Sequence, residues 1–206
     1  MTFALMRRHE AIFLEEPPSA DFNDMLQGDV SIDEYLMSLD VEYPEFSRRM
    51  CCRLRNLHTK GKVIVQVEPF LKVLLGIHHF FAEGHTPDDL PKDAIEYPVY
   101  LAERNATGAL LAYYRSAVVG SFEETLTAII RFARLDAARF RLRDSLRAQA
   151  LASLVGKFPS AYIEAGVIHY QLCQLLRQEL PRQTRVRPVF LADFVFGSIY
   201  NKKAKL

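Results

Sequence analysis

The 206-residue sequence has only three cysteines, and two of them, Cys51 and Cys52, are adjacent. Such a set has neither the number nor the spacing of a disulfide framework or a zinc site, and it indicates a reducing compartment. No apolar run is long enough to span a membrane. Residues 1–8 lack the apolar core and the cleavage site of a signal peptide. We therefore expect a cytoplasmic protein that has no membrane partner.

The sequence also lacks the common short motifs of nucleotide-binding and serine-dependent enzymes. Neither GxGxxG nor GxxxxGK[ST] occurs, so there is no glycine-rich loop to bind phosphate groups. No GxSxG elbow presents a serine nucleophile. The 26 basic and 25 acidic residues leave a net charge of +1, which creates no overall field toward nucleic acid. The expected partner is a small-molecule or peptide substrate, and not a nucleic acid.

What the sequence does contain is typical of one globular α/β domain over residues 1–206. Half of the residues are hydrophobic and a quarter are charged, a normal composition for a folded domain of this length. Short apolar runs separated by helical patterns predict a mostly parallel sheet with flanking helices. The expected strands are 10–15, 63–67, 161–165 and, near the C-terminus, 187–191. A helical insertion at about 98–155 interrupts the alternation, with helices expected at 103–115, 122–134 and 136–155.

Polar side chains follow three of the expected strands. The first strand ends at Glu15-Glu16, the second at Glu68 before Pro69, and the third leads through Gly166 to His169. Parallel strands bring their carboxyl ends to one edge of a sheet, where α/β folds bind ligands. We therefore expect Glu16, Glu68 and His169 to converge. A shift of one residue in the strand register would place Glu15 there in place of Glu16.

An imidazole and two carboxylates at one edge are compatible with two kinds of chemistry. They could bind a divalent metal such as Mn, Co or Zn, or they could act as general acid and base without a metal. The structural alternatives are a histidine that caps a helix, and acids that complement the dipole of a following helix.

Arginines on the predicted helices complete the candidate site. Arg143 and Arg147 are one helical turn apart and should point the same way, and Arg104 follows a short segment at 98–101 that we expect to be extended. Arginine suits an anionic substrate group or a carboxylate of the site. Because four arginines on the helix 136–155 cannot all be buried, the alternative is a solvated helix face. We predict catalytic roles for Glu68, Arg104, Arg143 and His169.

A family resemblance rests on the order of these motifs. The run Arg-Asp-x-x-Arg-Ala over 143–148, a following helix, a strand that leads into Gly-x-x-His over 166–169, and a further helix resemble the second half of the TraB, Tiki and ChaN-like superfamily, which includes erythromycin-esterase-like proteins. The earlier strand that ends at Glu15-Glu16 is similar to the strand of that superfamily that ends in a glutamate.

The resemblance implies an α/β sheet with helical insertions and one of three functions. Tiki-like members imply a metal-dependent peptidase, ChaN-like members a haem-binding protein, and the esterase-like branch the hydrolysis of a lactone. These families begin with a strand that carries its own Gly-x-x-His or Gly-Glu-x-His, and no such motif precedes Glu10. Residues 3–6 resemble the end of a helix without its beginning, so we expect that this first strand lies upstream of the sequence.

The leading hypothesis from the sequence is therefore a hydrolase-like protein whose site, with or without a divalent metal, lies at the carboxyl edge of the sheet. Glu16, Glu68 and His169 would bind metal or transfer protons, and Arg104 and Arg143 would hold an anionic group. The alternatives are a non-catalytic protein that binds haem, with His169 as axial ligand, or another small ligand, and a degenerate scaffold member of the same superfamily.

Overall fold

A computed structural model describes residues 2–39 and 41–191. In this part of the chain, three parallel strands form a small sheet in the order β2-β1-β3. Their bounds are Ala11–Leu14 for β1, Val63–Gln66 for β2 and Ala161–Ile163 for β3. In the register of the sheet, Ile12 on the central strand lies opposite Ile64 and Tyr162. The predictions of an α/β fold and of parallel pairing are confirmed, with a sheet that is small relative to its helices.

Helices account for most of the remaining described residues, and several begin at signals visible in the sequence. Pro44 and Pro69 occupy the first turn of their helices, where the missing N–H costs nothing. Ser31 and Ser121, each followed three residues later by a glutamate, form capping boxes at the starts of their helices. The helices are α1 (Thr2–Met6), α2 (Phe22–Gln27), α3 (Ile32–Met37), α4 (Pro44–His58), α5 (Pro69–Ala82), α6 (Glu96–Val119), α7 (Phe122–Val155) and α8 (Leu172–Glu179), with a short 3-10 helix η1 (Pro87–Asp89).

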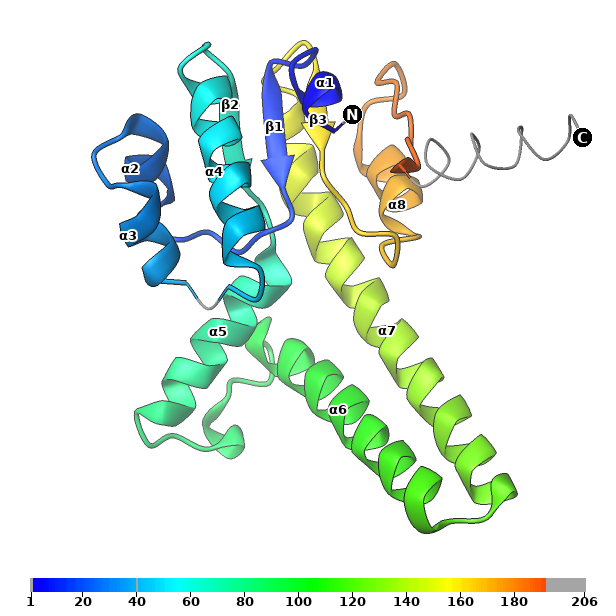
Figure 1. Ribbon diagram of the computed structural model, residues 1–206. Helices are drawn as coiled ribbons and strands as arrows, with labels where there is room; N and C mark the ends of the chain where they lie inside the picture. Colours follow the sequence, from blue (N-terminus) through cyan, green and yellow to red (C-terminus); the bar gives the residue numbers. More distant parts are fainter. Residues whose placement is uncertain (1, 40, 192–206) are drawn as a thin grey trace, which may run out of the picture.

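The sheet lies between two layers of helices, and its central strand is buried on both faces (Figure 1). Ile12 and Leu14 pack into a core formed with α2, α3 and α4. Ala11 and Phe13 point the other way, into a core formed with the C-terminal half of α7 and with α8. Because successive side chains of a strand alternate between faces, this packing fixes which residues beyond Leu14 face each layer.

The segment between β2 and β3 contains a long helical hairpin. Helices α6 and α7 run antiparallel, and their connected ends project away from the sheet (Figure 1). The expected break between residues 134 and 136 does not exist, because no glycine or proline interrupts the 34 residues of α7. The expected extended run at 98–101 is likewise wrong, since these residues belong to α6. A third core, built around Phe70, Ile77 and Val99, joins the base of the hairpin to α5.

The fourth strand, expected at 187–191, is not formed. Pro181 and Pro188 remove backbone donors from this part of the chain, and the segment is instead fixed by Val186, whose carbonyl oxygen accepts a hydrogen bond from Arg177 at 3.1 Å. Among the helices of the described residues, none is long and apolar enough to cross a membrane.

Candidate functional site

The alternation of β1 decides which of two adjacent glutamates reaches the site. Phe13 faces α7 and α8, and Glu15, two residues later, continues on that face. Its carboxylate accepts a hydrogen bond from the Gly166 N–H at 2.6 Å. Glu16 follows the opposite face, where it accepts a hydrogen bond from Gln66 at 2.9 Å. Glu15 therefore takes the position that was predicted for Glu16.

Arg147 of α7 joins the carboxyl ends of all three strands. Its Nε donates to the carbonyl oxygen of Val67 at 2.9 Å and its Nη2 to that of Glu164 at 2.6 Å. Its Nη1 lies 3.5 Å from Glu15 Oε2. The residue is fully buried, so the cost of removing the guanidinium from water is offset only by these partners.

Arg143 lies one turn before Arg147 on the same face of α7, as predicted. Its Nη2 donates to Glu15 Oε1 at 3.1 Å, and its Nε lies 3.2 Å from Glu68 Oε1. Glu68 is fully buried at the start of α5, and its second oxygen lies 3.9 Å from Arg147 Nε. Two guanidinium groups are thus interleaved with the carboxylates of Glu15 and Glu68.

His169 connects this cluster to a third carboxylate. Its Nδ1 is hydrogen-bonded to Asp144, which lies on α7 directly after Arg143. Its Nε2 lies 2.6 Å from Glu15 Oε1. The edge of the ring packs against Phe140 with 5.6 Å between ring centroids. The imidazole is consequently held in one orientation, with Asp144 on one side and Glu15 on the other.

The charges of the cluster shift the pKa values of His169 and Glu15 in opposite directions. Burial alone would lower the pKa of His169, but the contacts with Asp144 and Glu15 outweigh it and raise that pKa to about 9. Burial would raise the pKa of Glu15, yet His169 and the Gly166 N–H hold this pKa below its usual value. At neutral pH His169 is therefore an imidazolium, and Glu15 is a carboxylate.

A fourth acid, Glu164, stands at the end of β3. Burial, followed by the charge of Glu16, raises the pKa of Glu164 above its usual value. Glu164 and Glu16 occupy the face of the sheet that is turned away from His169, according to the alternation of the strands.

The cluster contains several buried polar atoms that lack a well-aligned hydrogen bond. In the described part of the chain, seven buried side-chain nitrogen or oxygen atoms have no hydrogen-bond partner. Five of them belong to four neighbouring residues of this cluster: both carboxylate oxygens of Glu68, Arg143 Nε, Arg147 Nη1 and His169 Nε2. Buried polar groups are normally satisfied, and leaving them unpaired is costly. Each of these atoms nevertheless lies within 4 Å of an oppositely charged group of the cluster, so the groups are held as ion pairs whose hydrogen-bond geometry is poor.

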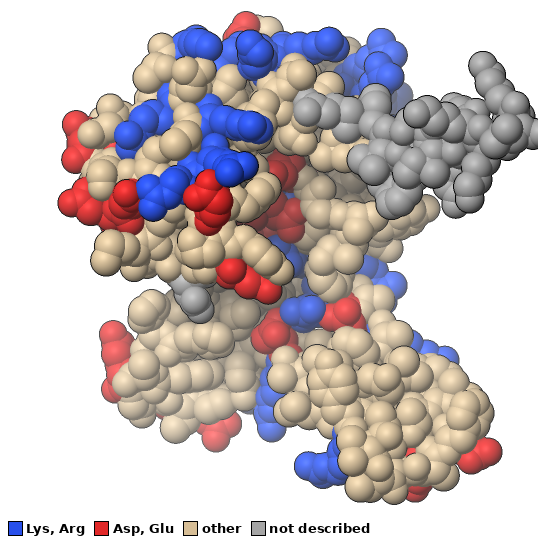
Figure 2. All heavy atoms as spheres, in the orientation of Figure 1, with Lys and Arg blue, Asp and Glu red and all other residues tan. Residues whose placement is uncertain are grey.

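The site opens to solvent at only a few atoms. The side chains of Arg143 and Glu15 are 14% and 16% exposed, whereas those of Glu68 and His169 are fully covered. Acidic and basic side chains also gather where the sheet meets the helices below it (Figure 2).

Two of the predicted site residues are not brought into the cluster. Glu16 makes its hydrogen bond with Gln66, and no ion pair joins it to His169 within the described ranges. Arg104 is exposed on α6 and packs its guanidinium over the ring of Tyr100, with 5.9 Å to the ring centroid. Glu68, Arg143 and His169 do converge.

Asp144 was not predicted as a site residue, and Arg147 was considered with Arg143 but not included among the catalytic residues, although both lie within the Arg-Asp-x-x-Arg-Ala run. The spacing indicates Arg147, because residues four apart on a helix lie on the same face, but it does not indicate Asp144, which is adjacent to Arg143.

The residues present do not fit a divalent metal in this arrangement. Across residues 2–39 and 41–191, no group of three or more His, Cys, Asp or Glu side chains is placed to hold a metal ion. Both oxygens of Glu15 already contact guanidinium groups, which compete with a cation for the carboxylate. Haem coordination by His169 would require Nε2 to leave Glu15, since Nδ1 is bonded to Asp144.

The chain is similar in sequence to an archaeal protein. An uncharacterised protein of Archaeoglobus fulgidus is 30% identical over 174 residues, which is 84% of this chain and 58% of the archaeal protein. The chain thus spans little more than half the length of that relative. No protein-family model matches the chain. No solved structure matches it.

Proposed function

We propose that this chain is a hydrolase-like protein in which Glu15 and His169 act as general base and general acid at the carboxyl edge of the sheet. The single observation that carries the proposal is the contact of 2.6 Å between Glu15 and His169, whose pKa values are shifted in opposite directions within one largely buried cluster. Buried groups whose pKa values are perturbed by a specific charge partner, as those of Glu15 and His169 are, are typical of a functional site.

The proposed reaction is the hydrolysis of an ester, a lactone or an amide. Glu15, which is ionised, accepts one proton from a water molecule while the oxygen of that water forms a bond to the carbonyl carbon. Arg143 stabilises the negative charge that develops on the carbonyl oxygen. When the bond to the leaving group breaks, His169 donates its proton to the leaving oxygen or nitrogen. The proton on Glu15 then passes to His169 across the 2.6 Å that separates them, and the site is restored.

The neighbouring residues position these groups. Asp144 holds the Nδ1 side of the imidazole and stabilises its charged form, as carboxylates do for catalytic histidines in other hydrolases. Glu68 lies between the two arginines and balances their charge. The resemblance to the TraB, Tiki and ChaN-like superfamily supports the same proposal, and of its branches the lactone-hydrolysing one agrees best with a site in which guanidinium groups occupy the space between the carboxylates.

Enzyme assays with a panel of activated esters, lactones and peptides test the proposal. We expect hydrolysis by the wild type and a loss of about 100-fold or more in His169→Gln. His78→Gln is the matched control, because His78 is exposed on α5, outside the cluster. Equal activity in the wild type and His169→Gln, or no hydrolysis of any of these substrates by the wild type, would contradict the proposal.

Metal analysis separates this function from the metal-dependent and haem-binding alternatives. The proposal predicts that hydrolysis persists in the presence of a chelator, and that elemental analysis finds no stoichiometric Mn, Co or Zn. Stoichiometric metal in the wild type that is lost in His169→Ala and Glu68→Ala would show a metal site instead. A Soret band that disappears in His169→Ala would show a haem protein.

A further inference from the structure

The hairpin of α6 and α7 exposes a continuous set of large apolar side chains at its projecting end. These residues are between 39% and 83% exposed, far more than the buried side chains of the core. They recur at intervals of three and four on each helix, so each set forms a stripe. The stripes consist of Leu111, Tyr114 and Val118 on α6 and of Phe122, Leu126, Ile129 and Ile130 on α7.

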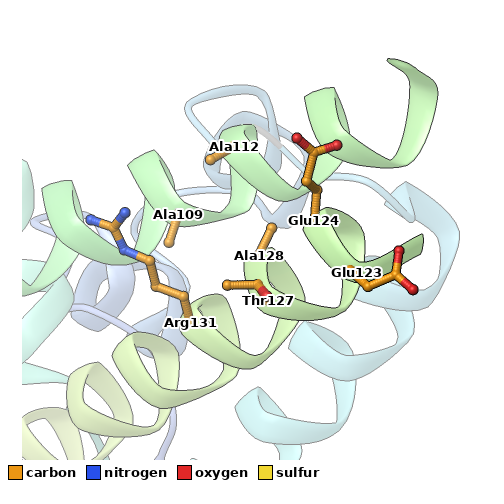
Figure 3. Close-up of a pocket in the computed structure, with 7 residues that line it drawn as sticks. All are labelled: Ala109, Ala112, Glu123, Glu124, Thr127, Ala128 and Arg131. Atoms are coloured by element: carbon orange, nitrogen blue, oxygen red, sulfur yellow. The ribbon is translucent and has the colours of Figure 1, made fainter. Parts of the chain in front are cut away.

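The two stripes lie on the same side of the hairpin. On each helix, the stripe residues come about one position after the residues that face the partner helix, so the stripe is turned to one side of the helix–helix contact. Because the two helices run antiparallel, this same offset along each chain turns both stripes toward the same face of the hairpin. The opposite face has a different character, with a shallow groove of about 380 Å³ lined by small residues together with Glu123, Glu124 and Arg131 (Figure 3).

The exposed apolar area is large enough for a stable protein interface. Apolar and aromatic side chains present on the order of 150 to 200 Å² each when fully exposed, so the seven residues at their observed exposures leave roughly 700 Å² uncovered. Two such faces in contact would bury roughly 1,400 Å², which is within the range of standard interfaces. Exposed patches of this size on a folded chain mark interaction sites.

The charges around the stripes argue for a protein partner and against a lipid surface. Segments that insert into membrane interfaces carry Lys and Arg beside their apolar face. Along the stripes, residues 111–130, the charged residues are Arg115, Glu123 and Glu124, which leave a net charge of −1. The segment therefore lacks the group of basic residues that attracts a helix to an anionic membrane, and its apolar face is better suited to a second apolar face.

We propose that the exposed face of the α6–α7 hairpin binds the same face of a second copy of this chain, so that two hairpins form a four-helix bundle. A two-fold axis makes one patch its own partner. The stripes supply the a/d-type positions of such a bundle core. The inference is independent of the proposed hydrolytic reaction, since it uses the opposite end of α7 from Arg143.

Sedimentation equilibrium of the purified chain over a range of micromolar concentrations tests the proposal. We expect a species of twice the 23.6 kDa chain mass. Leu126→Glu places a charge in the centre of the face and should raise the dimer dissociation constant by about 100-fold or more. Val118→Glu on α6 should have the same effect, which guards against a defect specific to one helix.

Thr127→Glu is the matched control, because Thr127 is adjacent to Leu126 but lines the groove on the other face. This variant should remain dimeric, and far-UV circular dichroism should show equal helix content in all four proteins. A monomeric wild type, or a dimer that persists in both Leu126→Glu and Val118→Glu, would overturn the proposal. A monomer that binds vesicles of anionic lipid would also overturn it and would assign the face to a membrane.

Discussion

The charge of His169 makes a measurable contribution to stability that depends on Asp144. The pKa of His169 is raised from 6.5 to about 9 in the folded protein, and each unit corresponds to about 1.4 kcal/mol. Protonation of this one group therefore stabilises the folded state by roughly 3 kcal/mol. Because the folded pKa lies above the unfolded pKa, the contribution is complete below pH 6.5 and is lost as the pH rises through about 9.

Replacing Asp144 by asparagine should remove much of this contribution. The amide keeps a hydrogen-bond acceptor for His169 Nδ1–H but not the charge that favours the imidazolium. We expect the pKa of His169, measured by NMR titration of its ring, to fall by more than one unit in Asp144→Asn. We also expect the unfolding free energy, measured with urea, to decrease less between pH 6.5 and pH 9.5 in the variant than in the wild type.

Other groups also titrate at alkaline pH, so His169→Gln provides the reference. Asp144→Asn and His169→Gln should both show the shallow pH dependence, and the wild type alone should show the additional loss of about 3 kcal/mol. The reasoning would be refuted if His169 titrated at or below 6.5 in the wild type, or if all three proteins lost stability equally between these pH values.

Three further predictions concern the elements that hold the site. Arg147→Met should destabilise the fold by about 3 to 5 kcal/mol in urea titrations, because Glu68 then remains buried with one partner fewer; a change below 1 kcal/mol would contradict the role given to Arg147. Leu151→Ala removes a fully buried side chain beneath the sheet and should cost about 2 to 5 kcal/mol in the same assay, whereas a neutral effect would mean that α7 does not form this core. Ser121→Ala removes the side chain that caps α7 and should cost about 1 kcal/mol in thermal unfolding, with no change in hydrolytic activity.

The elements of the fold were predictable where local signals agreed with each other. The strands near residues 12, 64 and 162 are short apolar runs bounded by Gly, Pro or acids, and the capping boxes at Ser31 and Ser121 mark helix starts directly. Other predictions of elements were wrong. Residues 134–136 contain no Gly or Pro, which favours the one continuous helix over the two that were predicted. The apolar run at 187–191 is not paired with the sheet, and this outcome depends on tertiary packing.

The candidate site was predictable in its place but not in all of its members. Parallel strands require their ends to meet at one edge, which correctly brought Glu68 and His169 together. The choice between Glu15 and Glu16 depends on which face of β1 packs against α7, and that follows only from tertiary packing. Arg104 was misplaced for a similar reason, because the direction in which the hairpin projects cannot be read from the spacing of its apolar residues.

The most direct test of the proposed chemistry compares two adjacent residues. Glu15→Gln and Glu16→Gln make the same chemical change on opposite faces of one strand end. The account predicts that Glu15→Gln lowers kcat for ester or lactone hydrolysis by about 100-fold or more, while Glu16→Gln retains nearly the activity of the wild type. Loss of activity in Glu16→Gln with full activity in Glu15→Gln would contradict the assignment of the general base.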